Sequence, residues 1–463
     1  MEWTPKISKA DGPRYLALAG AIAHAIDNGE LSPGAQLPPQ RDLAERLGVT
    51  VGTVGRAYAL AKSRRLVTGE VGRGTFVCSA DDVDSQGGRV MPKPAERDTI
   101  DLVCYRSPVP GLGDLVAQSV ARFGEESNRH VNAYAPDNGF LTHRIAGATW
   151  IARAGLSVGP EQVMVVNGAQ QGITAAVMAL CRAGDTILTE AVTYSGLRAI
   201  TWLHGVQLHG VGVDPHGMVP AEFDAACVET GARVAYVQPT LHNPTTATMP
   251  TARRKQIAEI ARKRGVVMIE DDAGASALHG NRPPALSSFL PDQSCYITSV
   301  SKSISPSFRL GYVACTPHLY ERLSSAFQAM SLAASPLIAQ VVAGMIGDGS
   351  AEQIAKRTVD ELSRRQRLAV ELLKGFEVMS DPSASFLWLT LPSGWDSGEF
   401  VAEAKRRGVS VVSSVHFAVD RSLRSRAIRI RLCPKVGPDA LKTALGTIVS
   451  IMRSNPPLNA TVI

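Results

Sequence analysis

The sequence contains seven cysteines but no Cys-x-x-Cys pair, so neither a zinc site nor a disulfide framework is expected. Its ten histidines include no His-Glu-x-x-His arrangement, and we expect no metal ion. No apolar run approaches the ~20 residues that cross a bilayer, and residues 1–4 do not have the pattern of a signal peptide. These absences predict a soluble protein without a membrane partner, in a reducing, cytoplasmic setting.

Length and charge leave several classes of protein open. With 463 residues, the chain is long enough for two or three domains. Hydrophobic residues make up 45% and charged residues 19%, which is typical of globular proteins. The net charge of +6 is compatible with a nucleic-acid partner but does not require one.

Three regions of the chain differ in pattern. Residues 12–78 predict short helices followed by a Gly-rich hairpin, and residues 79–98 have the Ser, Gly, Pro and charged composition of a linker. Residues 99–455 predict an α/β domain, because buried-strand runs alternate with Ala- and Leu-rich helical stretches. The runs are 162–167, 185–190, 206–213, 234–238, 266–270 and 295–300. They predict a mainly parallel sheet flanked by helices, and the later runs 386–391 and 427–433 indicate a smaller α+β subdomain.

The first region has the pattern of a winged helix-turn-helix. Apolar positions at spacings of three and four predict a helix over 15–26. Residues 37–48, with Pro38 and Pro39 in the first helical turn, and residues 51–65 predict two further helices joined by a tight turn. The buried face of the last helix is expected to comprise Val54, Ala57, Tyr58 and Ala61. A strand–turn–strand wing is expected over 66–77.

Three stretches of this region resemble the GntR family of bacterial transcription regulators: 31–41 (LSPGAQLPPQR), 43–53 (LAERLGVTVGT) and 72–77 (GRGTFV). The resemblance implies a recognition helix in the major groove of double-stranded DNA. The DNA-contacting residues implied by it are Arg41, Thr50, Thr53 and Arg56, with Arg73 on the wing. Gly55 departs from the family, since an arginine is common there. Taken one at a time, the arginines are equally compatible with ordinary solvated charges.

Lys302 is the most informative residue of the third region. It follows the apolar run 295–298, where a partly desolvated amine loses its proton readily and can form a Schiff base with an aldehyde. The hydroxyls of Ser299 and Ser301, and Arg309 seven residues further on, suit a phosphate dianion. A lone lysine after a strand is usually a surface residue, but its spacing to Arg309 favours a binding site.

Residues 99–455 resemble the fold-type I aminotransferases, which depend on pyridoxal 5′-phosphate (PLP). Together with the GntR-like segment, the chain resembles the MocR subfamily. The resemblance implies that Lys302 carries PLP and that Ser299 and Arg309 hold its phosphate. Residues 165–172 (VVNGAQQG) run from a strand into a helix, and the N–H groups at a helix N-terminus bind phosphate readily. The family pattern assigns Ala169 and Gln170 to this phosphate contact.

The same resemblance implies contacts to the rest of the cofactor. Tyr194 is expected to stack on the pyridine ring, although a core tyrosine is an equally good interpretation of that residue alone. Asn243, in the turn PTLHNPT, is expected to donate to the phenolate oxygen. Asp271 is expected to face the pyridine nitrogen and keep it protonated, so that the ring can withdraw electrons. Asp272 remains the alternative for that role.

Further positions bear on catalysis and assembly. A tyrosine normally follows the family's aspartate by two or three residues and bonds the phenolate, but this chain has Ala-Gly-Ala at 273–275, which argues against efficient transamination. Tyr134 matches a tyrosine that reaches the phosphate of a partner subunit, which implies a homodimer. Arg429 matches the arginine that clamps a substrate carboxylate, with Arg431 on the same strand face as the alternative.

Two functions follow from these patterns. The first is a PLP-binding, DNA-binding transcription regulator whose aminotransferase-like domain senses an effector, an amino acid or the cofactor. A ligand changes the arrangement of domains only if it binds the two arrangements with different affinity. The alternative is an active PLP-dependent aminotransferase that carries a DNA-binding domain. A third, weaker hypothesis is a structural DNA-binding protein with a vestigial PLP site.

Overall fold

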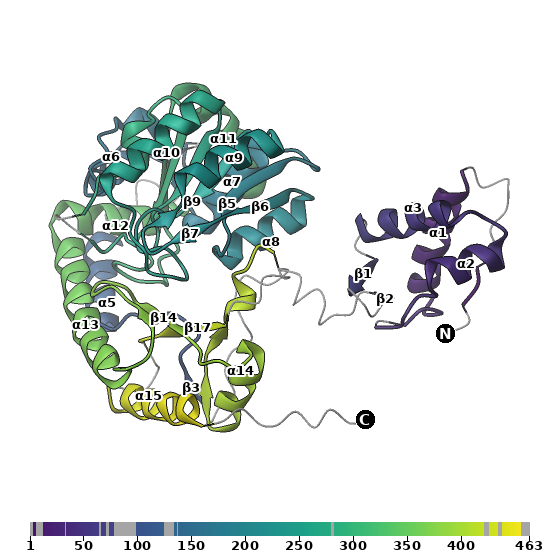
Figure 1. Ribbon diagram of the computed structural model, residues 1–463. Helices are drawn as coiled ribbons and strands as arrows, with labels where there is room; N and C mark the ends of the chain where they lie inside the picture. The colour runs from purple at the N-terminus through teal and green to yellow at the C-terminus, as the bar shows by residue number, and fades with distance from the viewer. Residues whose placement is uncertain are drawn as a thin grey trace. The chain divides into compact units, whose positions relative to one another are not determined.

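The computed structural model describes most of the chain in two compact units, Met1–Arg89 and Val90–Ile463 (Figure 1). The described residues are 3–5, 13–32, 34–63, 66–70, 74–77, 99–124, 134–136, 138–278, 282–420, 426–433 and 438–454. Arg73 and the whole of the predicted linker, 79–98, lie outside them. Each unit is described by itself below.

The first unit is built on three helices and a hairpin. The elements are α1 (Arg14–Asp27), α2 (Gln40–Leu47), α3 (Val51–Ser63), β1 (Val67–Glu70) and β2 (Gly74–Val77). The predicted face of α3 is confirmed, since Val54, Ala57, Tyr58 and Ala61 are all buried. The prediction that prolines occupy the first turn of α2 is wrong: the helix begins at Gln40 and Pro39 precedes it. At the other end Gly48, with φ of 59°, supplies the left-handed residue that stops α2 before the turn.

A seven-stranded sheet forms the centre of the second unit. Its order is β4 (Val163–Val166), β12 (Gly311–Cys315), β11 (Ser294–Ser299), β10 (Val267–Asp271), β9 (Val234–Val237), β5 (Thr186–Glu190) and β6 (Gln207–Val211). β12 is antiparallel to both of its neighbours, and the other pairings are parallel. The predicted mainly parallel sheet is therefore confirmed. β12 is the strand that the sequence pattern did not reveal.

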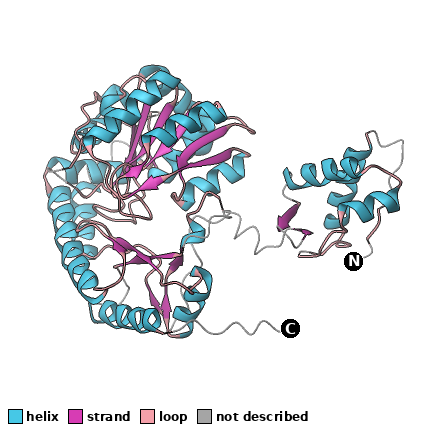
Figure 2. Ribbon diagram, in the orientation of Figure 1, coloured by secondary structure: helices cyan, strands magenta, loops and turns pink. Residues whose placement is uncertain are grey.

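Helices cover both faces of this sheet (Figure 2). Alternate residues along a strand enter different clusters: Tyr236 of β9 packs in one core, while Ala235 and Val237 pack in another. The helices of this part are α5 (Leu112–Gly124), α6 (Leu141–Ala152), α7 (Ala169–Leu180), α8 (Ser195–His204), α9 (Pro220–Thr230), α10 (Thr251–Arg264), α11 (Pro317–Ser331) and α12 (Pro336–Gly347). A small hairpin, β7 (Val213–Asp214) and β8 (Gly217–Met218), follows β6.

The predicted α+β subdomain is present at the C-terminal side of the unit. Its antiparallel sheet has the order β13 (Val378–Met379), β14 (Phe386–Thr390), β17 (Ala427–Arg431) and β16 (Val412–Ser413). The helices are α13 (Ser350–Leu372), α14 (Ser397–Arg406) and α15 (Pro438–Arg453), and α13 links this part to α12 (Figure 1). β3 (Ile100–Asp101) pairs with β15 (Val409–Ser410), which anchors the start of the unit here. In the part of the chain that is described, no helix is both long and apolar enough to span a membrane.

Candidate functional site

The predicted site residues of the second unit follow the carboxyl ends of neighbouring strands. Lys302 follows β11, Asp271 ends β10, and Asn243 lies in the turn after β9. Tyr194 follows β5, and the turn after β4 leads into α7. Because the carboxyl ends of parallel strands share one edge of a sheet, these segments meet there, where α/β proteins commonly bind ligands.

Lys302 lies among aromatic and cationic side chains. Its Nζ is 4.0 Å from the centre of the Tyr105 ring, and the Tyr105 hydroxyl donates to the Lys302 carbonyl oxygen at 2.9 Å. Burial, followed by the charges of Arg431, Arg429 and Arg309, lowers the pKa of the Lys302 amine well below its usual value. The amine therefore loses its proton more readily than a surface lysine does, which makes it a better nucleophile.

Asp271 is buried and held by three donors. Its Oδ2 accepts from the Tyr236 hydroxyl at 2.6 Å and from Gln238 Nε2 at 2.9 Å, and its Oδ1 accepts from the Ala273 N–H at 2.9 Å. Burial raises the pKa of this carboxyl, and the hydrogen bonds oppose that shift. The carboxylate is thus fixed in orientation before any ligand arrives.

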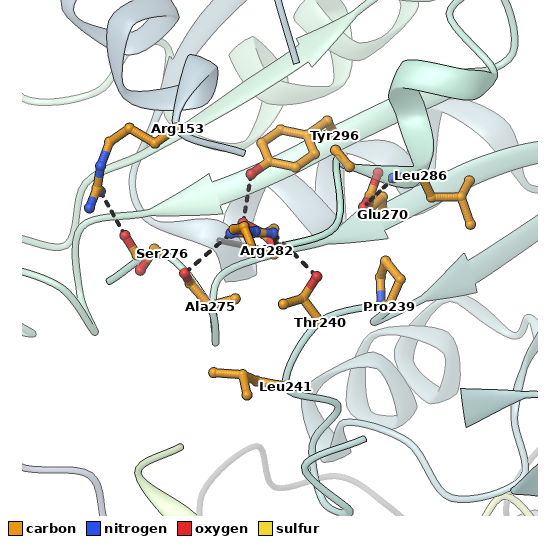
Figure 3. A network of polar contacts seen from close by, with 12 residues as sticks. Arg153, Pro239, Thr240, Leu241, Glu270, Ala275, Ser276, Arg282, Leu286 and Tyr296 are labelled. Atoms are coloured by element: carbon orange, nitrogen blue, oxygen red, sulfur yellow. Dashed lines mark hydrogen bonds and ion pairs between the residues drawn. The ribbon is translucent and has the colours of Figure 1, made fainter. Parts of the chain in front are cut away.

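Asp272 has a different environment. Arg282 donates to both of its oxygens, one of them at 3.0 Å, and the Tyr296 hydroxyl donates to Oδ2 at 2.6 Å. Arg282 also reaches Thr240 Oγ1 at 3.2 Å and the carbonyl oxygen of Ala275 at 3.4 Å (Figure 3). Asp272 is therefore part of a buried ion pair with Arg282, and Asp271 is the carboxylate without a cationic partner among the described residues.

The turn between β4 and α7 forms a cradle beside Arg309. Gly168 has φ of 80°, and a Cβ added there would come within 3.2 Å of Arg309 Nη2. The Tyr194 hydroxyl donates to Gln170 Oε1 at 2.8 Å, which joins the predicted ring-stacking residue to the start of α7. Ala169 is the first residue of that helix, so its N–H points away from the helix with no intrahelical acceptor.

The segment between β11 and Lys302 is rich in hydroxyl groups. Ser299 is buried, and its Oγ accepts from the Ser301 N–H at 3.4 Å. The Oγ of Ser301 is buried without a hydrogen-bond partner among the described residues. A buried hydroxyl without a partner is unfavourable, so this position favours a ligand group nearby.

Arg429 and Asn243 contact one another, although they are far apart in the sequence. Arg429 Nη1 donates to Asn243 Oδ1 at 3.0 Å, and its Nη2 donates to the Val103 carbonyl oxygen at 3.3 Å. Arg431, two residues along β17, donates from Nη1 to Ser385 Oγ at 2.7 Å. Both arginines are buried, and burial is the main cause that lowers the pKa of each guanidinium.

Tyr134 does not join this buried cluster within the single chain, since its side chain is 86% exposed.

In the first unit, the predicted DNA-contacting residues Arg41, Thr50 and Arg56 are exposed. The hydroxyl oxygens of Thr50 and Thr53 lie 2.9 Å apart, and Thr50 Oγ1 accepts the Thr53 N–H at 3.2 Å. Thr50 therefore caps α3 as well as facing solvent.

Tyr105, Tyr236 and Gln238 are the site residues that the sequence did not reveal. Tyr105 reaches Lys302 because β3 pairs with β15, a contact between segments about three hundred residues apart. Tyr236 and Gln238 lie on and just after β9, and their alternation along the strand puts both on one face. That alternation is the sequence pattern from which Tyr236 and Gln238 could have been predicted.

Within the described residues, no group of acidic, histidine and cysteine side chains could hold a metal ion.

Comparisons with known proteins identify both units. Residues 14–77 match the bacterial regulatory proteins of the gntR family, and residues 111–448 match aminotransferase class I and II. The uncharacterized HTH-type transcriptional regulator YdeF of Bacillus subtilis (strain 168) is 33% identical, over 94% of this chain and 93% of YdeF. The HTH-type transcriptional regulator TauR of Rhodobacter capsulatus is 25% identical, over 93% of this chain and 95% of TauR.

Solved structures agree on the fold of the second unit. LysN, the α-aminoadipate aminotransferase of Thermus thermophilus complexed with N-(5′-phosphopyridoxyl)-L-leucine, superposes with a TM-score of 0.70 at 21% identity. The match covers 77% of this chain and 92% of LysN. The chain therefore belongs to the aminotransferase class I and II family, and it carries an N-terminal GntR-family DNA-binding domain in an arrangement that matches the MocR architecture.

Proposed function

We propose that this protein is a cytoplasmic transcription regulator of the MocR subfamily that binds PLP at Lys302 and senses a small amine-bearing ligand there. The observation that carries this proposal is the meeting of the Lys302 amine, the Asp271 carboxylate and the cradle at Gly168 at one edge of the sheet. We also propose domain boundaries at 78/79 and 98/99, with residues 79–98 acting as the linker.

The residues present fit the phosphate of PLP. The N–H groups of Ala169 and Gln170 start α7, where a helix N-terminus favours anions, and the Arg309 guanidinium lies against the same turn. Ser299 completes the proposed phosphate site from the end of β11. Glycine at position 168 leaves the backbone accessible to a ligand. A side chain there would also contact the Arg309 guanidinium too closely.

The remaining residues fit the pyridine ring. Asp271 is proposed to face the ring nitrogen rather than Asp272, because Arg282 occupies both oxygens of Asp272. Asn243 accepts from Arg429 through Oδ1, so its Nδ2 is left to donate to the phenolate oxygen. Tyr194 is proposed to stack on the ring. When bound, PLP supplies an aldehyde that reacts with the Lys302 amine and a ring that withdraws electrons from a bound amine.

The tyrosines near the site do not replace the missing family tyrosine. The Tyr236 hydroxyl donates to Asp271, and the Tyr105 hydroxyl donates to the Lys302 carbonyl oxygen. A phenolic O–H has one proton to donate, so neither group is left for the phenolate oxygen. This arrangement supports sensing over rapid turnover.

Ligand sensing predicts a change in DNA affinity. The full-length protein is expected to bind fluorescent DNA from its own upstream region with an affinity that differs between the protein without PLP, the PLP-loaded protein, and the PLP-loaded protein with amino acids. Coupling between two sites is typically about 5–150-fold. Fluorescence anisotropy measures this change, and borohydride reduction followed by peptide mass spectrometry places the cofactor on the lysine. Equal DNA affinity under all these conditions would reject the sensing role.

An active aminotransferase is the second candidate, and it is favoured by the presence of both a buried carboxylate, Asp271, and a buried guanidinium, Arg429. Incubation of the holoprotein with single amino acids is expected to yield the amine form of the cofactor and the matching oxo acid if this function is present. Liquid chromatography separates both products. A protein that changes its DNA affinity but never forms these products is a sensor without turnover.

We further propose that the active unit is a homodimer in which Tyr134 reaches the phosphate site of the partner subunit. The exposed ring of Tyr134 supports a contact outside its own chain. Sedimentation equilibrium of the full-length protein is expected to give twice the chain mass, and a monomer with full PLP occupancy contradicts the proposal.

If α3 contacts DNA, replacement of Arg56 is expected to lower the affinity for DNA. This residue is exposed on α3, opposite the buried face formed by Val54, Ala57 and Tyr58. Arg56→Ala is expected to weaken DNA binding by about 1–3 kcal/mol, and a lower salt dependence would indicate a phosphate contact. Anisotropy titrations at several salt concentrations measure both effects. Arg367→Ala, on the exposed face of α13, is the control that leaves binding unchanged.

A further inference from the structure

The strands β5 and β9 are neighbours in the central sheet, but they separate before their carboxyl ends. They pair only at Ile187 with Val234 and at Leu188 with Ala235. Beyond these residues β5 continues to pair with β6, and β9 continues to pair with β10. The strand order also reverses here, because β6 lies on one side of β5 and the later strand β9 lies on the other. A gap at such a reversal is where open α/β sheets bind ligands.

Glu190, the last residue of β5, spans this gap with its side chain. Its Oε1 accepts the backbone N–H of Gln238, just after β9, at 2.9 Å, and its Oε2 accepts from the Thr189 hydroxyl at 3.2 Å. Glu190 is buried, and among the residues that the structure describes no cation lies within ion-pair distance of it. The side chain therefore gives the Gln238 N–H an acceptor at the point where the two strands no longer pair.

Gln238 connects Glu190 to two residues of the proposed cofactor site. Its Nε2 donates to Asp271 Oδ2 at 2.9 Å, and its Oε1 accepts the backbone N–H of Asn243 at 3.3 Å. The side-chain amide is therefore used at both ends, once for the carboxylate proposed to face the ring nitrogen and once for the turn that presents Asn243. Because Glu190 fixes the backbone from which this amide extends, a shift of Gln238 would move both contacts together.

The contact made by Glu190 is more constant than its charge. Burial raises the pKa of the Glu190 carboxyl to about 7, and the charge of Asp271 adds to this shift, while the hydrogen bonds from Gln238 and Thr189 oppose it. Near neutral pH the group therefore carries a proton part of the time. The oxygen that accepts the Gln238 N–H is present in both forms, so an uncharged amide of the same size can take the place of the carboxyl.

We propose that Glu190 is a positioning residue of the cofactor site. By holding the backbone of Gln238 in the gap between β5 and β9, it keeps the Asp271 carboxylate and the Asn243 turn aligned toward one ligand ring. The contact, rather than the charge, performs this role, and Glu190 acts through Gln238 rather than on the ligand itself. This inference rests on the proposed function for the identity of the ring.

Two substitutions separate the contact from the charge. Glu190→Gln keeps an oxygen for the Gln238 N–H and removes the charge, whereas Glu190→Asp keeps the carboxylate and shortens its reach by one methylene. Calorimetry of the full-length protein with pyridoxine 5′-phosphate is expected to show nearly the natural affinity in Glu190→Gln. Glu190→Asp is expected to bind this probe about tenfold more weakly, because misalignment of a hydrogen bond to a charged group costs that much.

Other results would overturn the positioning role. Equal affinities in the natural protein and both variants reject it, and so does the opposite order, in which the charge alone preserves binding. A tenfold loss in Glu190→Gln rejects it even if the aspartate variant does not fold, because glutamine preserves both the size and the acceptor.

A purely structural role of Glu190 makes a different prediction. Inorganic phosphate occupies only the proposed phosphate cradle at Gly168 and Arg309, so its affinity, followed by phosphorus NMR, is expected to be unchanged in Glu190→Asp. A general loosening of the site would lower the affinities for both probes, and that result overturns the proposal. Glu222→Asp is the matched control, because Glu222 also accepts a backbone N–H, that of Gly212 beyond the edge strand β6, at 3.0 Å. It should leave both affinities unchanged.

The choice of probe separates this inference from the proposed function. Pyridoxine 5′-phosphate has an alcohol in place of the aldehyde, so its binding does not depend on a reaction with Lys302. Absence of covalent PLP, with the contrast between the two Glu190 variants retained, rejects only the cofactor role of Lys302. Covalent PLP without that contrast rejects only the positioning role of Glu190.

Discussion

Lys302→Ala is expected to abolish the covalent attachment of PLP. Lys302 supplies the amine proposed to react with the cofactor aldehyde, and its lowered pKa favours the reactive neutral form. After borohydride reduction, the natural protein should carry the added mass on the peptide containing Lys302, and the variant should carry none. At a PLP concentration one hundred times Kd, binding adds about 2.7 kcal/mol to the free energy of unfolding. The variant is expected to lose most of that gain in urea titrations.

The loss is not expected to come from misfolding of the variant. Burial and three arginines disfavour the protonated amine, so the alanine variant without PLP should unfold at no lower urea concentration than the natural protein without PLP. Lys374→Ala removes an exposed lysine from the same unit and should leave the attachment of PLP to Lys302 complete. Label on another lysine in the Lys302 variant, or an unchanged gain in stability with PLP, would show that the cofactor does not depend on this residue.

The sheet was predictable because its signals are local. Each of the six apolar runs overlaps one strand of the seven-stranded sheet, although β10 and β11 are shifted from their runs by one residue. Burial on both faces explains why the runs of the inner strands are continuous rather than alternating, whereas the edge strand β6 is mostly half-buried. β12 was not predicted because Gly311–Cys315 comes two residues after Arg309, and that segment was interpreted only for the phosphate-binding role of Arg309. Its antiparallel pairing with both neighbours is a property of topology, which no local run encodes.

The site residues that directly follow a predicted strand could be predicted from the sequence. Lys302, Asp271 and Asn243 each follow a predicted strand, so the shared edge of a parallel sheet brings them together. Tyr105 was not predictable in this way. It belongs to a segment held by the pairing of β3 with β15, and such distant pairing depends on the complete fold.

The choice between Asp271 and Asp272 shows what only tertiary structure supplies. Two adjacent acidic residues after a strand are equivalent in the sequence, and alternation puts them on opposite sides of the chain. The structure gives one of them Tyr236 and Gln238, and gives the other Arg282. Arg282 is ten residues away along the chain, and the described residues between the two, 273–278, belong to no helix or strand, so no local pattern predicts its contact with Asp272.

Arg282→Met is expected to cost about 3–5 kcal/mol of the free energy of unfolding, since it leaves the buried carboxylate of Asp272 without its cation. Removing one partner of a buried pair is more costly than removing both. The double variant Arg282→Met with Asp272→Asn is therefore expected to recover a large part of the loss. Urea unfolding of the four proteins of this cycle gives the coupling between the two side chains.

A surface pair provides the matched control for this prediction. Arg264 donates to both oxygens of Asp224, at 2.7 and 3.0 Å, but this pair is open to solvent. Arg264→Met is expected to change stability far less than Arg282→Met, because water replaces the lost partner. Equal losses at the two positions would mean that burial does not set the cost at Arg282. Because Asp272 adjoins Asp271, a large loss of stability in the Arg282 variant should also lower PLP occupancy, which would link the buried ion pair to the orientation of Asp271.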